Sequence, residues 1–146
     1  MRILSAIALF FLLSSFTSWE TNFDKAKQQA AAEHKYIVLN FSGSDWCGPC
    51  IRLHHEVLES TAFIAFAEKH LILVNADFPR QKKNQLAKAQ QQLNDQLADR
   101  YNAKGSFPLT VLLTADGKLV KEWEGYPKMT VDEFVADIQN VIDSNK

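Results

Sequence analysis

The stretch NFSGSDWCGPC, residues 40–50, contains both cysteines of the chain, Cys47 and Cys50, and it decides the expected fold. It begins inside YIVLNFS, residues 36–42, a run of apolar and β-branched residues typical of a strand that is buried on both faces. The residues that follow, CGPCIRLHHEVLES, have the spacing of a helix with one apolar face. The cysteine pair is therefore predicted at a junction between a strand and a helix.

Two cysteines this close together can form a structural disulfide, part of a metal site or a redox pair. A disulfide that closes so short a loop removes little entropy from the unfolded chain and stabilises little. A zinc site needs about four ligands. The nearby His54 and His55 are adjacent in a predicted helix and do not share a face, so they complete a metal cage poorly. The pattern favours a redox pair over the two alternatives and predicts no metal.

A cysteine pair at a helix N-terminus suits exchange with other disulfides. The attacking species is a thiolate, and the positive end of the helix dipole stabilises it. We therefore expect Cys47 to attack a substrate disulfide and Cys50, one turn inward, to resolve the mixed disulfide. Gly48 lets the backbone approach closely, Pro49 stiffens the first helical turn, and Trp46 forms an apolar rim beside the attacking sulfur.

The rest of the chain alternates between helical and strand patterns. Helices are predicted at residues 22–34, 61–70, 81–103 and 130–142, and strands at residues 71–79 and on both sides of the turn Asp116-Gly117. Alternation in the first half predicts parallel strands, and the hairpin adds an antiparallel edge. The fold class is therefore α/β, with a mixed central β-sheet and helices on both faces.

The longest predicted helix, residues 81–103, contains no glycine or proline. Leu86, Leu93, Leu97 and Tyr101 recur in it at spacings of seven, four and four, which predicts an amphipathic helix. We expect the leucines to face inward as cover for the core rather than to form a partner surface. The basic run at residues 80–83 is interpreted as a solvated turn.

Composition and the N-terminus indicate an exported single domain. The chain has 146 residues and is 47% apolar, enough for one core. Arg2 precedes an apolar run, residues 3–13, and small hydroxyl residues, which predicts a signal peptide over residues 1–18 and a folded domain over residues 19–146. An uncleaved anchor is the less favoured alternative. The mature domain has 15 basic and 17 acidic residues, a net charge of −2, and nothing in it suggests binding to nucleic acid.

At WCGPC, residues 46–50, the sequence resembles the thioredoxin family, and residues 104–125 resemble that family's proline-containing strand and hairpin. The resemblance covers about residues 22–142 and implies a thioredoxin-like fold. It implies that Pro108 follows a cis peptide bond and faces the cysteines, and that the backbone of Phe107 binds an extended substrate segment. The substrate-binding residues expected in this way are Trp46, Gly48, Pro49, Phe107 and Pro108.

Within the family, the signal region and the long helix resemble the exported DsbH-type periplasmic disulfide reductases. The resemblance implies a periplasmic or otherwise extracytoplasmic, monomeric thiol–disulfide oxidoreductase that needs no cofactor. Its partners would be disulfide-containing proteins and a DsbD-type membrane electron donor. The Gly-Pro dipeptide between the cysteines is that of thioredoxin and favours a reductase. A disulfide oxidase or isomerase and a polypeptide-binding module are the alternatives.

One position departs from the family pattern. Ordinary thioredoxins carry a buried aspartate on the strand before the motif, where it accepts the proton of the second cysteine. This strand offers Asn40 and Phe41 instead, and neither side chain is a base. Asp45 adjoins Trp46 but is expected to be exposed. The proton acceptor for Cys50 is therefore left open, with water as a possible carrier.

Overall fold

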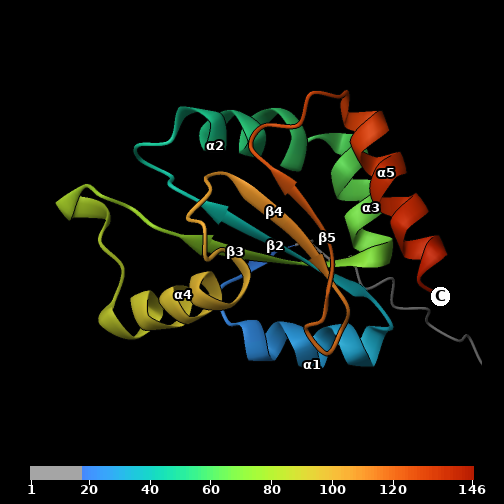
Figure 1. Ribbon diagram of the computed structural model, residues 1–146, viewed down its shortest axis with the longest axis horizontal. Coiled ribbons are helices and arrows are strands. Elements are labelled where there is room, and N and C mark those ends of the chain that lie inside the picture. The colour runs from blue at the N-terminus through green and yellow to red at the C-terminus, as the bar shows by residue number, and fades with distance from the viewer. Residues whose placement is uncertain (1–17) are drawn as a thin grey trace, which may run out of the picture.

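A computed structural model describes residues 18–146 of the protein (Figure 1). The predicted signal peptide lies outside these residues, apart from its last position. The strands are β1 (Trp19–Glu20), β2 (Tyr36–Ser42), β3 (Leu71–Asp77), β4 (Leu109–Leu113) and β5 (Leu119–Glu124). The helices are α1 (Phe23–Glu33), α2 (Gly48–Leu53), α3 (Thr61–His70), α4 (Lys88–Tyr101) and α5 (Val131–Ser144), with a π-helical turn η1 (His54–Leu58) and a 3-10 turn η2 (Lys82–Asn84).

The five strands form one mixed sheet in the order β1-β3-β2-β4-β5. Strands β1 and β2 both run parallel to β3, and β4 is antiparallel to β2 and β5. The predicted pairing of parallel strands with an antiparallel hairpin is confirmed. Strand β1 was not predicted, because two residues carry no recognisable period.

Helices cover both faces of the sheet, as predicted (Figure 1). Helices α2, α3 and α5 pack with the turn η1 on one core, to which β2 contributes Val38. Helices α1 and α4 cover the other core, to which β2 contributes Ile37, Leu39 and Phe41. This burial on both faces is the reason why β2 is a continuous apolar run. Within residues 18–146, no helix combines the length and apolarity that crossing a membrane requires.

Local signals set several of the element ends. The side chain of Asn22 accepts a hydrogen bond from Lys25 N and caps α1, and Thr130 and Glu133 form a capping box at the start of α5. Gly117 adopts φ +88° in the hairpin turn, a conformation that favours glycine. These interactions join residues only a few positions apart, which is why the sequence pattern indicates them.

Helix α4 differs from the prediction. It begins at Lys88 rather than near residue 81, and the expectation that Leu86 and Leu93 face inward is wrong. Leu93 is 40% exposed and Leu86 lies before the helix, whereas Asn94 is buried beside Leu97. The amide of Asn94 donates to the Asp77 carbonyl at 2.9 Å, at the end of β3. A satisfied polar side chain therefore occupies the inward position, and Leu93 is rotated about 100° from it around the helix.

An ionic contact joins β5 to α5. Lys121 Nζ donates to both oxygens of the Asp137 carboxylate at 2.9 Å, and Trp123 Nε1 donates to one of them at 2.8 Å. Burial raises the pKa of Asp137, but the hydrogen bonds from Lys121 and Trp123 outweigh it and hold this pKa below its usual value. A carboxyl group with a lowered pKa stabilises the fold above its unfolded pKa, about 4, and loses this effect as the pH falls through the folded pKa.

We therefore expect Asp137→Asn to lower the free energy of unfolding by about 1–2 kcal/mol at neutral pH, a value discounted for partial exposure. The difference from the unmodified protein should shrink as the pH falls below about 4. Urea unfolding of both proteins at about pH 7 and pH 3 measures it. Asp99→Asn, on the exposed side of α4, is the matched control. A difference of the same size at both pH values would contradict the expectation.

Candidate active site

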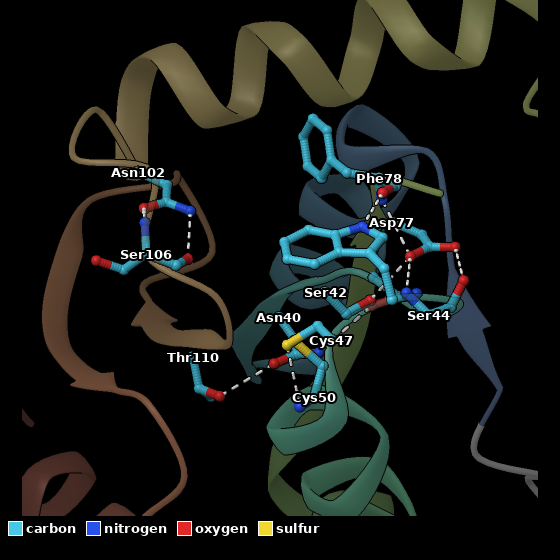
Figure 2. The surroundings of a disulfide bond; sticks show 12 residues. Asn40, Ser42, Ser44, Cys47, Cys50, Asp77, Phe78, Asn102, Ser106 and Thr110 are labelled. Carbon is cyan, nitrogen blue, oxygen red and sulfur yellow. Dashed lines mark hydrogen bonds between the residues drawn. A yellow bond between two sulfur atoms is a disulfide. The ribbon is translucent and has the colours of Figure 1, made fainter. Parts of the chain in front are cut away.

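Cys47 and Cys50 form a disulfide at the start of α2, with their Cα atoms 5.2 Å apart (Figure 2). Cys47 is the N-cap of the helix, and its sulfur accepts a hydrogen bond from Cys50 N at 3.2 Å. The sulfur of Cys47 thus lies where free backbone N–H groups and the helix dipole favour a negative charge. Cys47 is 5% and Cys50 2% exposed. The predicted junction between strand and helix is present.

The two residues between the cysteines lie on the outer side of the disulfide. Gly48 and Pro49 occupy the first turn of α2 and are both exposed. A Cβ atom added at Gly48 would have no neighbour within 4 Å, so the fold itself does not require glycine there. This side of the pair is open to an approaching chain.

Three aromatic side chains adjoin the cysteine loop, and we call Trp46, Phe78 and Phe107 the aromatic cluster. The ring of Phe107 meets those of Trp46 and Phe78 edge to face, with both centroid distances 5.5 Å. Trp46 Nε1 donates to the Phe78 carbonyl at 2.8 Å. Phe78 was not among the residues expected at the site. The signal that could have found it is its place after β3, because the end of β3 pairs with the end of β2.

The peptide bond between Phe107 and Pro108 is cis, as the family resemblance implies. Pro108 is buried and stands immediately before β4. Leu109 pairs with Phe41 in the antiparallel ladder, so Pro108 lies at the end of β2 from which the cysteine loop begins. Phe107 and Pro108 are therefore brought to the same edge of the sheet as the disulfide.

Gly43 is the residue at which the backbone and Trp46 come closest. A Cβ atom at Gly43 would lie 2.3 Å from the Trp46 ring, a distance that real Cβ atoms do not adopt. The carbonyl of Gly43 also accepts hydrogen bonds from the backbone N–H groups of Trp46 and Cys47. The absence of a side chain at Gly43 thus allows the indole to lie flat on the loop before the disulfide.

Asp45 was expected to be exposed, but it is half-buried and makes several hydrogen bonds. Its carboxylate accepts hydrogen bonds from Arg80 N, Gln81 N and Asn84 Nδ2, each at 2.9 Å. The backbone hydrogen bond from Arg80 is the main cause that holds the pKa of Asp45 below its usual value. Asp45 therefore ties the cysteine loop to residues 78–87, the segment between β3 and α4, which we call the arm.

The arm also contacts the aromatic cluster. The guanidinium of Arg80 lies 3.6 Å from the centre of the Trp46 ring, a cation–π contact. The interpretation of residues 80–83 as only a solvated turn is therefore wrong for Arg80. The physical reason is the register of β2 and β3, which places the chain after Asp77 directly over the cysteine loop.

We expect Asp45→Ala to loosen the arm, because three donor groups of the arm lose the carboxylate that accepts their hydrogen bonds. Trypsin cleaves after basic residues, and the arm offers Arg80, Lys82 and Lys83. Limited proteolysis followed by mass spectrometry should detect cleavage within residues 80–83 several-fold faster than in the unmodified protein. The control Asp99→Ala should leave this rate unchanged. Equal cleavage rates in all three proteins would contradict the expectation that Asp45 holds the arm in place.

Polar side chains lie beneath the disulfide, on the strands rather than on the cysteine loop (Figure 2). Asn40 is buried, accepts a hydrogen bond from Thr110 Oγ1 at 3.2 Å and donates to Asn75 Oδ1 at 3.5 Å. Ser42 Oγ lies 3.1 Å from the same Asn75 oxygen and 3.2 Å from an oxygen of Asp77. Asn40 of β2, the position expected to lack a base, thus carries an amide whose oxygen and nitrogen are both hydrogen-bonded.

A cavity of about 210 Å³ reaches this network from the surface. Its lining combines the strand network with one side of α2 and η1, and consists of Asn40, Ser42, Ser44, Cys50, Ile51, His54, His55 and Asn75. Over residues 18–146, no group of three or more His, Cys, Asp and Glu side chains could hold a metal ion. The cavity thus brings Cys50 and two histidines to one space without forming a metal site.

The fold and the site together define a class. A mixed sheet in this strand order, a Cys-X-X-Cys disulfide at the start of the helix after β2 and a cis proline before β4 describe a thioredoxin-fold protein with a dithiol–disulfide pair. Residues 23–142 match the family model of the thioredoxin-like domain. The chain belongs to this thioredoxin-like family.

The chain is similar in sequence to two proteins whose names refer to disulfide reduction or to thioredoxin. Over 100 residues the chain is 40% identical to the disulfide bond reductase DsbH of Chlamydia pneumoniae, a match that covers 68% of this chain and 58% of the relative. It is 24% identical over 127 residues to the thioredoxin-related protein DsbJ of the same organism, covering 87% of this chain and 36% of the relative. The chain thus spans less than two thirds of the length of either relative.

Among solved structures, the protein resembles a DsbH oxidoreductase with a TM-score of 0.78 and 32% sequence identity. That similarity covers 86% of this chain and 84% of the solved chain. The fold around the cysteine pair is therefore shared over most of the solved chain.

Proposed function

We propose that the protein is a thiol–disulfide oxidoreductase that reduces disulfides of other proteins. The observation that carries the proposal is the Cys47–Cys50 disulfide at the N-terminus of α2, beside the aromatic cluster. The N-terminus of the helix stabilises a thiolate on the sulfur of Cys47, and the sulfur of Cys50 lies one turn further along the helix. The family membership and the name of the DsbH relative support the same chemistry.

The reaction proceeds by two exchanges between sulfurs. In the reduced protein, the Cys47 thiolate attacks one sulfur of the substrate disulfide, which forms a mixed disulfide and releases the other substrate sulfur as a thiolate. Cys50 then loses its proton and attacks the sulfur of Cys47. This step forms the Cys47–Cys50 disulfide, breaks the mixed disulfide and releases the second substrate thiolate. Two electrons pass from the cysteine pair to the substrate.

The substrate polypeptide binds across the open side of the pair. Exposed Gly48 and Pro49 leave room for the approaching chain, and Trp46 and Phe107 provide apolar contact beside it. The substrate chain runs extended along the backbone of Phe107, next to Pro108, which immediately precedes β4. No cofactor takes part, because both electrons are carried by the two sulfurs.

The direction of electron flow is the part of the proposal that a single measurement tests. Equilibration with glutathione gives the reduction potential of the Cys47–Cys50 pair. A value near about −270 mV, that of thioredoxin, supports a reductase, and a value near about −120 mV, that of the oxidant DsbA, overturns it in favour of an oxidase. A reductase also needs a source of electrons, and we propose a DsbD-type membrane donor acting on the protein as a monomer.

We further propose that residues 1–18 direct export and that residues 19–146 act outside the cytoplasm. Arg2 and the apolar run at residues 3–13 support a signal peptide. Fractionation of expressing cells, followed by N-terminal sequencing of the protein, tests this. Retention of the full-length chain in the cytoplasm would refute the proposal.

A further inference from the structure

The cavity beside Cys50 also has two histidines in its lining. Cys50 and His54 both line this cavity. They are four residues apart on one helical face, and His54 N–H donates to the Cys50 carbonyl, so the two side chains lie one turn apart. Asn40, Ser42 and Asn75 line the same space but are not bases at neutral pH. Besides Cys50, the titratable side chains of the lining are His54 and His55.

The helix is locally distorted at this point. The turn η1 is a π-helical turn that begins at His54, where Glu59 N–H donates to the His54 carbonyl five residues back. The extra residue brings Glu59 beneath both histidines. Glu59 Oε1 lies 3.2 Å from His54 Nε2, and Glu59 Oε2 lies 2.6 Å from His55 Nδ1. π-helical turns of this kind are frequently found at functional sites.

The ring of His54 lies among groups that can orient it and stabilise its protonated form. The titratable groups that contact its ring are Glu59 and His55, Cys50 lines the same cavity, and from β1 it meets the uncharged ring of Trp19 at a centroid distance of 6.1 Å. The hydrogen bond from His55 is the main cause that holds the pKa of Glu59 below its usual value, so Glu59 remains a carboxylate. This carboxylate orients the imidazole and stabilises the imidazolium that forms when the ring accepts a proton.

We propose that His54 accepts the proton of Cys50 through water in the cavity when Cys50 attacks the mixed disulfide. The volume of about 210 Å³ has room for several water molecules, and the strand amides and hydroxyls offer them partners. The proton moves from Cys50 Sγ through water to a ring nitrogen of His54. The Cys50 thiolate then forms the bond to Cys47 while the substrate sulfur leaves with its electron pair. His54 would thus replace the strand carboxylate that the family pattern leads one to expect, and this inference rests on the proposed function.

His55 is the less suitable of the two histidines. It is five residues from Cys50, and its side chain is 66% exposed, against 41% for that of His54. The pair therefore provides a matched comparison on the same cavity. His54→Gln keeps a polar side chain in the lining and removes only the titratable group.

The test separates the two exchanges. Reduced protein is converted to a mixed disulfide between Cys47 and thionitrobenzoate at about pH 4 and then shifted to higher pH, and the release of thionitrobenzoate by Cys50 is followed in a stopped-flow instrument. In the unmodified protein the release rate should rise with pH, because only a neutral imidazole can accept the proton of Cys50. In His54→Gln the rate at about pH 7 should fall roughly tenfold to a hundredfold, and this rise should disappear.

Three further measurements distinguish proton transfer by His54 from a structural role of this residue. The rate at which Cys47 first attacks the reagent should be the same in His54→Gln as in the unmodified protein, and added imidazole should accelerate release in His54→Ala. His55→Gln should keep the pH profile. Release from His54→Gln within about twofold of the unmodified rate, or loss of the profile in His55→Gln alone, would overturn the inference. An unmodified protein that never releases thionitrobenzoate would instead refute the proposed function.

Discussion

Replacing Cys50 with serine is expected to abolish turnover and to leave Cys47 covalently joined to its substrate. Cys47 remains at the helix N-terminus, where its thiolate is stabilised and still attacks. The hydroxyl of serine does not resolve the mixed disulfide, so the intermediate accumulates. Turnover should fall to the uncatalysed rate in an assay of protein-disulfide reduction, and adducts should appear in non-reducing gels and in mass spectra.

The matched control for this experiment is Cys47→Ser. Cys50 is 2% exposed and faces the cavity, so the control should lose turnover without accumulating adducts. Adducts in equal amounts from both variants would contradict the assignment of Cys47 as the attacking residue. If the Cys50→Ser variant replaces the unmodified protein in cells without loss of function, a polypeptide-binding module is favoured over an enzyme.

Replacing Phe134 with alanine should lower the free energy of unfolding by about 3–5 kcal/mol, the cost typical of removing a fully buried aromatic ring. Phe134 is 1% exposed on α5. Its ring stacks on Phe63 of α3 at 6.2 Å and meets Trp123 of β5 at 5.3 Å. The substitution therefore leaves a cavity where two helices join the sheet. Urea unfolding at neutral pH measures the loss.

Leu119→Ala is the control for Phe134→Ala. Leu119 belongs to the edge strand β5 and is 45% exposed, so its removal should cost less than about 1 kcal/mol. Similar losses in the two variants would show that the core formed by α3, α5 and β5 does not carry the stability expected from its burial.

The cysteine loop and the arm form one assembly at the edge of the sheet. Asp45 accepts three hydrogen bonds from the arm, Trp46 receives the guanidinium of Arg80, and the indole N–H donates to Phe78. These contacts lie beside the cysteine loop, whereas the cavity that His54 lines is bordered by Cys50. A substrate and a proton can therefore reach the two sulfurs from different directions.

The helices and strands whose apolar residues recur at a regular spacing could be predicted from the sequence. Strand β2 occupies the expected residues 36–42, α3 the expected residues 61–70, and the hairpin lies around Gly117. Apolar spacing, caps and turn residues act between positions a few residues apart, so a single sequence contains them. For the same reason the cysteine pair is found at the predicted start of a helix.

Prediction failed where a residue's neighbour is distant in the chain. Asp45 and Arg80 are 35 positions apart, and nothing near either residue indicates their hydrogen bond. Asn94 faces inward because the end of β3 provides a carbonyl, which the leucine spacing of α4 does not reveal. The two residues of β1 form a strand only because β3 offers an edge.

The sequence by itself determined a Cys-X-X-Cys pair between a buried strand and a helix, a mixed α/β fold, and the absence of a carboxylate at Asn40 and Phe41. Only the tertiary structure decided what surrounds the pair. Parallel β2 and β3 bring Asn40 beside Asn75, and the π-helical turn at His54 completes a cavity shared with Cys50. Sheet register and helix packing bring together segments that are distant in the chain. No local pattern in the sequence indicates which of these segments will meet.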